Sequence, residues 1–104
     1  MEARSVHILG ICGTFMGGLA LLAKETGFKV TGSDENIYPP MSNLLKEQGI
    51  EVIQGYKKKD LPKAELYVIG NVISRGNEAV EHILDTKLPY ASGPEWVLEN
   101  ILKN

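Results

Sequence analysis

The stretch HILGICGTFMGGLALLA (His7–Ala23) decides how this chain folds. A short apolar run leads into a cluster of glycines, and the glycines lead into an apolar, helix-forming segment. This order is typical of a strand, a tight phosphate-binding turn and a helix. The dinucleotide fingerprint G-x-G-x-x-G would start at Gly10, but Cys12 and Phe15 stand where its other two glycines should be. The sequence therefore predicts a phosphate-binding turn that differs from the dinucleotide form.

The composition is that of one folded domain, which we place at residues 1–104. Hydrophobic residues make up 43% and charged residues 23%, and the formal net charge of −2 gives no reason to expect a nucleic-acid partner. The basic run Lys57–Lys59 is predicted to be a solvated loop. A single cysteine excludes an internal disulfide, and no apolar run is long enough for a signal peptide or a membrane span. We therefore expect a cytoplasmic protein with no membrane partner.

Short β-type runs alternate with longer helical ones along the chain. Strands are predicted at 5–10, 28–34, 50–55, 65–70 and 88–92, and helices at 15–26, 42–49, 78–87 and 92–103. Strands that alternate with helices imply parallel pairing with right-handed crossovers. We predict an α/β fold: a Rossmann-like, doubly wound open parallel sheet of about five strands, with helices on both faces.

Several residues mark where the predicted helices begin and end. Ser42 and Asn77 are predicted N-caps, and Ser92 with Glu95 three positions later forms a capping-box pattern. Gly27 is placed to end the first helix in a left-handed conformation.

The first predicted helix, at residues 15–26, has an apolar stripe and two glycines that bear on its packing. Its buried stripe is predicted to contain Phe15, Leu19, Leu22 and Ala23. Gly17 and Gly18 are poor helix formers, and we expect a close approach of the sheet or of a ligand to compensate for them.

The ligand site of such a sheet lies outside the carboxyl ends of its strands, where the strand order reverses. With the order 3-2-1-4-5, the walls of this crevice are the turn at residues 10–18, Ser33 and Asp34 after the second strand, and the loop 70–77. A glycine turn at a helix N-terminus, an acid, an arginine and two asparagines meet there. This set of groups suits a nucleotide diphosphate.

Each group has an expected role and a structural alternative. The backbone N–H groups of Cys12 to Met16 would bind diphosphate oxygens, unless the glycines only make a tight turn. Asp34 follows Gly13 at the spacing where a carboxylate reaches ribose hydroxyls, unless it only forms a turn. Arg75 would hold a phosphate or a carboxylate, unless it is an ordinary surface residue.

Nothing in the sequence indicates a catalytic or metal centre. Two histidines and one cysteine show no metal-ligand spacing, and no nucleophile–base pair is apparent. Cys12 is predicted to fill space, His7 to be a hydrogen-bonded core or edge residue, and His82 to lie on an exposed helix face. The segment Ser92–Pro94 is interpreted as a helix start and not as part of a site.

Five segments, in this order, resemble the N-terminal domain of the Mur ligase family: HILGICGTFMGGLALLA, GSD followed by YPPMS, GIEVIQGY, IGNVISRGN and PYASGPEW. The resemblance covers nearly the whole chain. YPPMS and GTFMGG favour the member that joins a recycled L-alanyl-γ-D-glutamyl-meso-diaminopimelate tripeptide to UDP-N-acetylmuramate. They disfavour its relative that adds L-alanine.

The resemblance implies that this domain binds UDP-N-acetylmuramate. The turn would take the diphosphate, the end of the second strand would lie near the nucleoside, and the loop after the fourth strand would serve the uridine or sugar side. The implied substrate-binding residues are Gly10, Cys12, Gly13, Thr14, Phe15, Met16, Ser33, Asp34, Asn71 and Arg75. No residue of the chain is implied to be catalytic or to bind a metal.

The resemblance also implies what lies outside this chain. In the family enzyme a second domain uses ATP and Mg²⁺ to activate the muramate carboxylate, and a third domain brings the tripeptide amine that attacks it. The motif G-x-x-x-x-G-K-[ST] for ATP is absent from residues 1–104. We therefore expect a substrate-binding domain of a three-domain, ATP-dependent ligase of peptidoglycan recycling, inactive alone.

Two other functions fit the same fold. The chain could be the NAD(P)-binding domain of an oxidoreductase, or a standalone nucleotide-sensing module. Against NAD(P) stand Cys12 and Phe15, because a side chain at either position crowds the pyrophosphate or the helix–strand contact.

Overall fold

The computed structural model describes residues 4–70, 73 and 75–102. The strands are β1 (Ser5–Leu9), β2 (Lys29–Asp34), β3 (Glu51–Gln54), β4 (Leu66–Ile69) and β5 (Tyr90–Ser92). The helices are α1 (Thr14–Glu25), α2 (Met41–Glu47), α3 (Glu78–Asp85) and α4 (Gly93–Val97), with a 3-10 turn η1 (Lys58–Asp60) and a π-helical turn η2 (Leu98–Leu102). All strand pairs are parallel, in the order β3-β2-β1-β4-β5. The predicted fold class and strand order are confirmed.

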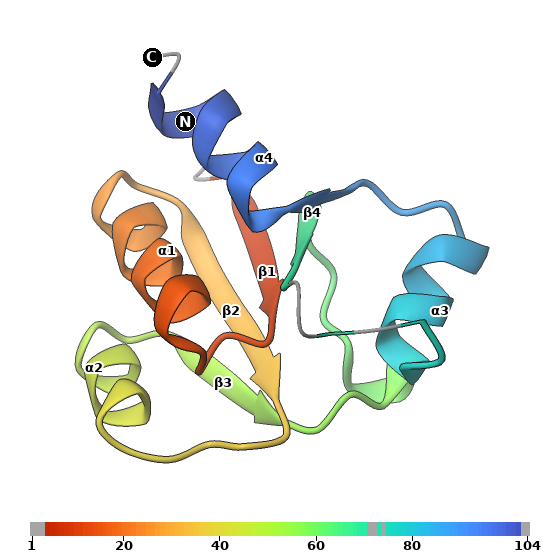
Figure 1. The fold of residues 1–104 in the computed structure, drawn as a ribbon, viewed down its shortest axis with the longest axis horizontal. Helices are drawn as coiled ribbons and strands as arrows, with labels where there is room; N and C mark the ends of the chain where they lie inside the picture. Colours follow the sequence, from red (N-terminus) through yellow and green to blue (C-terminus); the bar gives the residue numbers. More distant parts are fainter. Residues whose placement is uncertain (1–3, 71–72, 74, 103–104) are drawn as a thin grey trace.

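The register brings three strand ends to one edge of the sheet. Leu9 at the end of β1 is aligned with Ser33 of β2 on one side and with Ile69 of β4 on the other. The turn that connects β1 to α1 leaves the sheet at this same edge (Figure 1). The carboxyl ends of β1, β2 and β4 therefore form the rim of the expected crevice.

Helices cover both faces of the sheet (Figure 1). The larger core lies under α1, α2 and α4, and Trp96 and Leu45 are its fully buried contributions from α4 and α2. The smaller core lies under α3, where Val80 and Ile83 pack on Leu9 of β1. Because β1 contributes apolar side chains to both cores, its near-continuous hydrophobic run is the pattern expected for a central parallel strand.

The start of α1 differs from the prediction. Phe15 was placed on the buried stripe, but its side chain is 56% exposed and Met16 is buried in its place. The helix begins at Thr14, with Gly13 as its N-cap, and the Phe15 ring lies near Gly93 and outside the core. Gly27 ends the helix with φ +103, as predicted.

The capping predictions had mixed outcomes. The Asn77 side chain accepts hydrogen bonds from the first turn of α3, and Ser92 with Glu95 forms the capping box of α4. Ser42 is not an N-cap: α2 starts one residue earlier, and its N-cap is Pro40. The last predicted helix changes to π-helical hydrogen bonding after Val97.

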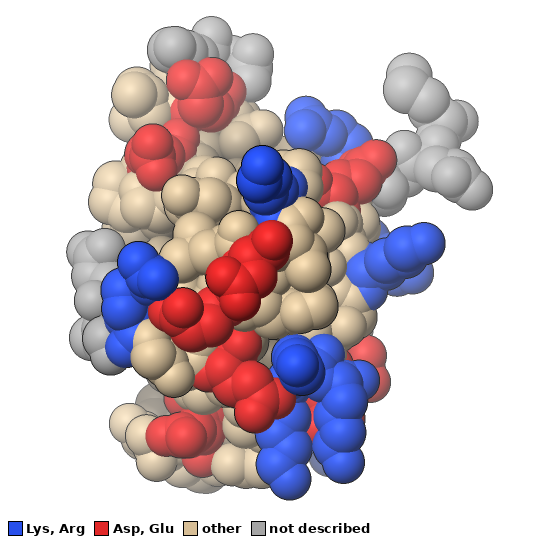
Figure 2. Space-filling view, turned by 90° about the vertical axis from the view of Figure 1, so that its right-hand side faces the viewer, with Lys and Arg blue, Asp and Glu red and all other residues tan. Residues whose placement is uncertain are grey.

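The face that carries α3 mixes acidic and basic side chains (Figure 2). The Lys58 backbone N–H donates to Glu78 of α3 at 2.6 Å, which ties the basic segment Lys57–Lys59 to the acidic helix. The three lysines are exposed, as predicted. Within the described part of the chain, no helix combines the length and the apolar character that a membrane crossing needs.

Candidate functional site

The turn between β1 and α1 is held by backbone hydrogen bonds. Gly10 has φ +82, a left-handed conformation that favours glycine, and its N–H donates to the Ser33 carbonyl at 2.8 Å. The Gly13 N–H donates back to the Gly10 carbonyl at 3.1 Å. Gly13 offers no side chain to cap α1. The first-turn N–H groups of Thr14–Met16 are therefore left for a partner outside the helix, the arrangement that binds anions.

Asp34 anchors the turn to the end of β2. Its carboxylate accepts the Cys12 N–H at 2.9 Å with one oxygen and the Asn36 N–H at 3.0 Å with the other. The Cys12 N–H is thus directed at Asp34 and away from the position expected for a diphosphate. Of the backbone N–H groups from Cys12 to Met16 that were expected to bind a diphosphate, only those of the first turn of α1, Thr14–Met16, remain available.

Ser33 lies behind the turn and does not face the crevice. Its hydroxyl is buried and pairs with Nε2 of His7 at 2.8 Å, while Nδ1 of His7 pairs with the Thr31 hydroxyl at 2.7 Å. His7 is fully buried and hydrogen-bonded, as predicted. Ser33 therefore supports the turn through its carbonyl, and its side chain belongs to the sheet.

Burial makes the imidazole of His7 a poor base and the thiol of Cys12 a poor acid. Desolvation lowers the pKa of His7 to about 4, so the ring is neutral at pH 7. Burial, together with the charge of Asp34, raises the pKa of the Cys12 thiol. A thiol with a raised pKa is a weak nucleophile, which agrees with the space-filling role predicted for Cys12. His82 is half-buried on α3, less exposed than predicted.

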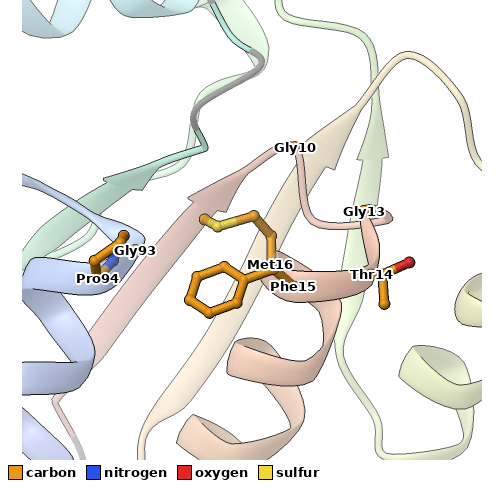
Figure 3. Close-up of a pocket in the computed structure, with 7 residues that line it drawn as sticks. All are labelled: Gly10, Gly13, Thr14, Phe15, Met16, Gly93 and Pro94. Carbon is orange, nitrogen blue, oxygen red and sulfur yellow. The ribbon is translucent and has the colours of Figure 1, made fainter.

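An apolar hollow of about 320 Å³ opens on the α4 side of the turn. The Phe15 ring and the Met16 side chain extend from the first turn of α1 toward Gly93 and Pro94, while the Thr14 side chain points the other way (Figure 3). The sequence interpretation treated Gly93 and Pro94 only as a helix start. Their place in this wall depends on how α4 docks beside α1, which no local pattern reveals.

Two further hollows lie on the other side of the turn, and we call them polar because the side chains of Asp34 and Asn36 line both. The smaller, of about 190 Å³, borders Gly10 and Gly13, and the larger, of about 620 Å³, borders Arg75. They share three lining residues: Asp34, Asn36 and Tyr56. Because Gly10 and Gly13 also line the apolar hollow, the three hollows form one crevice across the N-terminus of α1.

Arg75 stands on the far wall of the larger polar hollow. Its Nε and Nη2 donate to the Glu81 carboxylate at 2.7 and 3.1 Å, and the Gly76 N–H donates to the same carboxylate at 2.9 Å. The hydrogen bonds from Arg75 and Gly76 lower the pKa of Glu81 to about 2. Two of the five N–H donors of the guanidinium are thus used, and the carboxylate holds it at the crevice. Asn71, the other site residue expected in this loop, lies outside the described residues.

The arrangement suits binding more than catalysis. A row of helix N-terminal donors lies between an apolar hollow and a polar one, and the groups around it are amides, a carboxylate and aromatic rings. No cluster of three His, Cys, Asp or Glu side chains that could hold a metal is found in the described part of the chain. Asn36, Tyr38 and Tyr56 were missed by sequence reasoning. Their one signal was their position just after the second and third predicted strands.

A family model matches residues 5–103, and its description is "Mur ligase family, catalytic domain". Among curated proteins, the chain is 57% identical over 100 residues to the UDP-N-acetylmuramate–L-alanyl-γ-D-glutamyl-meso-2,6-diaminoheptandioate ligase of Escherichia coli K12. That match covers 95% of this chain and 22% of the relative. The UDP-N-acetylmuramate–L-alanine ligase of Psychrobacter sp. PRwf-1 is 34% identical over 86 residues, which are 83% of this chain and 18% of the relative.

A solved structure agrees with the sequence matches. The crystal structure of the UDP-N-acetylmuramate:L-alanyl-γ-D-glutamyl-meso-diaminopimelate ligase from Neisseria meningitides superposes with a TM-score of 0.95 at 53% identity. The match covers 98% of this chain and 32% of that chain. This chain thus spans about a fifth of the length of the E. coli relative.

Proposed function

The chain belongs to the Mur ligase family, and from this membership we propose that its crevice binds UDP-N-acetylmuramate. Both curated relatives described above carry UDP-N-acetylmuramate in their names. The higher identity to the tripeptide-adding ligase, 57% against 34%, favours that member of the family as the parent activity.

The observation that carries the proposal is the position of the first turn of α1 between two unlike hollows. The N–H groups of Thr14–Met16 have no acceptor within the helix, and they are the natural donors to a diphosphate. A nucleoside on one side and a sugar on the other then extend into the polar and the apolar hollow. The molecule that this crevice fits has a charged centre and two different ends.

The first turn alone does not account for useful affinity. A helix N-terminus contributes about 0.3–1 kcal/mol per favourable charge, up to ~2 kcal/mol when partly buried. A micromolar complex requires roughly 8 kcal/mol. The contacts in the two hollows must therefore supply most of the binding free energy, which makes the ends of the ligand as important as its phosphates.

We further propose that residues 1–104 form the substrate-binding N-terminal domain of a three-domain ligase in the bacterial cytoplasm. The ATP and Mg²⁺ that activate the muramate carboxylate, and the tripeptide whose amine attacks it, belong to the other two domains. This chain contributes substrate positioning and no catalytic group. The sequence of residues 1–104 contains no ATP-binding motif G-x-x-x-x-G-K-[ST], which supports the proposal that another domain binds ATP.

Isothermal titration calorimetry on the 104-residue chain tests the proposal. UDP-N-acetylmuramate should bind, and NAD and NADP should not, because the Phe15 ring stands where a dinucleotide fold places glycine. Binding of NAD without binding of the UDP-sugar would reject the proposal.

The same calorimetric titration, carried out on a variant at Arg75, tests whether this residue contacts the ligand. Arg75→Ala should weaken binding of UDP-N-acetylmuramate with little change in stability, because its ion pair is exposed. Arg4→Ala is the matched control, since Arg4 also pairs with a surface glutamate, Glu65, but lies outside the crevice walls that the structure describes. Equal affinity of both variants would make Arg75 an ordinary surface residue.

A further inference from the structure

Three polar side chains form a hydrogen-bonded group in the middle of an apolar sheet. His7 of β1 is aligned with Thr31 of β2, and its ring pairs with the Thr31 hydroxyl at 2.7 Å and with the Ser33 hydroxyl at 2.8 Å. His7 and Ser33 are buried, with exposed fractions of 0% and 3%. Burying polar groups costs free energy unless they are hydrogen-bonded, and an apolar residue at position 7 would fill the core without this cost. A role beyond packing would explain why a histidine stands there.

The Ser33 carbonyl connects this group to the binding turn. It accepts the Gly10 N–H at 2.8 Å. The Gly10 carbonyl in turn accepts the Gly13 N–H at 3.1 Å, and the Gly13 carbonyl accepts the Gly17 N–H at 2.7 Å. A continuous chain of hydrogen bonds thus runs from the His7 ring, through Ser33 and the turn, to the first turns of α1.

The end of β2 is held from both of its faces. The ladder between β1 and β2 ends at the pair of Leu9 and Ser33, where the turn begins. On one face the His7 ring binds the Ser33 hydroxyl. On the other face Gly32 leaves room for Ile11, whose N–H also donates to the Ser33 carbonyl, at 3.3 Å. Side-chain contacts at this end of β2, and not the strand ladder alone, therefore set where the turn lies.

We propose that His7 is a positioning residue for the ligand. Through the Ser33 hydroxyl it holds the Ser33 carbonyl, the carbonyl holds the turn, and the turn directs the N–H groups of Thr14–Met16 at the diphosphate. This inference rests on the proposed function and adds to it a residue that lines none of the three hollows described above. A buried side chain that orders a contacting group before the ligand arrives raises affinity, because less ordering remains to be done on binding.

Two substitutions at position 7 separate the link to Ser33 from the link to Thr31. A glutamine amide can reach the place of Nε2, which pairs with Ser33, whereas the shorter asparagine amide reaches only the place of Nδ1, which pairs with Thr31. In calorimetric titrations, His7→Gln should keep the affinity for UDP-N-acetylmuramate close to that of the unmodified chain. His7→Asn should weaken it about three- to ten-fold, the equivalent of one hydrogen bond.

Substitutions on β2 repeat the test without changing the buried histidine. Ser33→Ala and Thr31→Val each remove one hydrogen bond to the His7 ring, but only Ser33 carries the carbonyl that holds the turn. Ser33→Ala should therefore weaken binding as much as His7→Asn does, and Thr31→Val, the matched control, should leave the affinity unchanged. Equal losses in the two β2 variants would mean that His7 stabilises the sheet alone, and would overturn the inference.

An NMR measurement on the free chain reads the turn without a ligand. The scalar coupling across the hydrogen bond between the Gly10 nitrogen and the Ser33 carbonyl carbon depends on the geometry of that bond. It should decrease in Ser33→Ala and His7→Asn and persist in Thr31→Val and His7→Gln. Lower global stability alone would not change the coupling of the folded molecules. An unchanged coupling in Ser33→Ala would overturn the inference.

The outcomes separate this inference from the proposed function. Unchanged affinity in both Ser33→Ala and His7→Asn would overturn the positioning role of His7 while binding of UDP-N-acetylmuramate persists. Failure of the unmodified chain to bind UDP-N-acetylmuramate would overturn the proposed function, and the coupling in the free chain would still show whether His7 orders the turn.

Discussion

His7 occupies the middle of β1 with both ring nitrogens hydrogen-bonded to hydroxyl groups, Thr31 on one side and Ser33 on the other. The rings of Tyr67 and His7 pack edge to face at a centroid distance of 6.1 Å. None of these neighbours is a carboxylate or a cation. A buried imidazole in such surroundings stays neutral, and protonating it puts an uncompensated charge in the core.

Acid should therefore destabilise the fold through His7. Its pKa is about 4 when folded and 6.5 when unfolded. The unfolded chain thus binds more protons between these values, and stability is complete above pH 6.5 and falls as the pH drops toward 4. The loss amounts to about 3 kcal/mol in the free energy of unfolding.

Urea unfolding between pH 7 and pH 4 measures this loss. His7→Asn removes the titrating group, so its stability should depend less on pH than that of the unmodified chain, while His82→Gln should keep the dependence. An NMR titration of the His7 ring in the folded chain is a direct reading. A folded-state pKa near 6.5 would contradict the account.

Glycines at two positions serve packing. A Cβ on Gly32 of β2 would lie 2.7 Å from the Cβ of Ile11, and a Cβ on Gly17 would overlap the Met41 side chain. Gly32 therefore lets Ile11, the residue after Gly10 in the turn, lie flat across β2. Gly32 thus supports the turn from the neighbouring strand, in addition to Gly10 and Gly13 within the turn itself.

At the scale of elements, the crevice depends on a tether between β2 and the turn before α1. Asp34 ends β2 and accepts the buried Cys12 N–H, so the loop and the strand keep one relative position. The tether explains why the carboxylate is engaged even without a ligand. It also means that Asp34 contributes to stability, apart from the contact with the nucleoside that we propose for it.

Asp34→Ala should lower the free energy of unfolding by about 1–3 kcal/mol, because the Cys12 N–H loses its acceptor in a buried place. The pKa of the Cys12 thiol should fall, since the Asp34 charge helps to raise it. Urea unfolding and the pH dependence of thiol alkylation measure the two effects. Asp85→Ala, at an exposed position of α3, is the control, and equal stability of both variants would disprove the tether.

The elements themselves follow from sequence, and the site only in part. Alternating strands and helices, with Asn77 and Ser92 as caps, predict the sheet and its order because local signals agree with the global fold. Phe15 was misplaced because its helix starts one residue earlier and its ring lies beside Gly93 at the start of α4, a contact that no local pattern reveals. Tyr56 and Asn36 escaped prediction because they meet only when β2 and β3 are paired and their loops fold toward one another.

At the scale of the whole molecule, the sheet edge, the turn and two loops form one binding surface. Hollows of unlike character flank the N-terminus of α1: apolar toward α4, polar toward the ends of β2 and β3. We propose that this asymmetric crevice selects a ligand by its two ends and binds its charged middle through backbone N–H groups. This is the form of recognition that a nucleoside diphosphate sugar requires.

The decisive measurement is a crystal structure of the 104-residue chain grown with UDP-N-acetylmuramate, in the presence of NAD as competitor. Diphosphate oxygens should lie within hydrogen-bond distance of the backbone N–H groups of Thr14, Phe15 and Met16, with no dinucleotide in the crevice. A UDP-sugar bound away from that turn, or NAD lying across it, would disprove the proposed site.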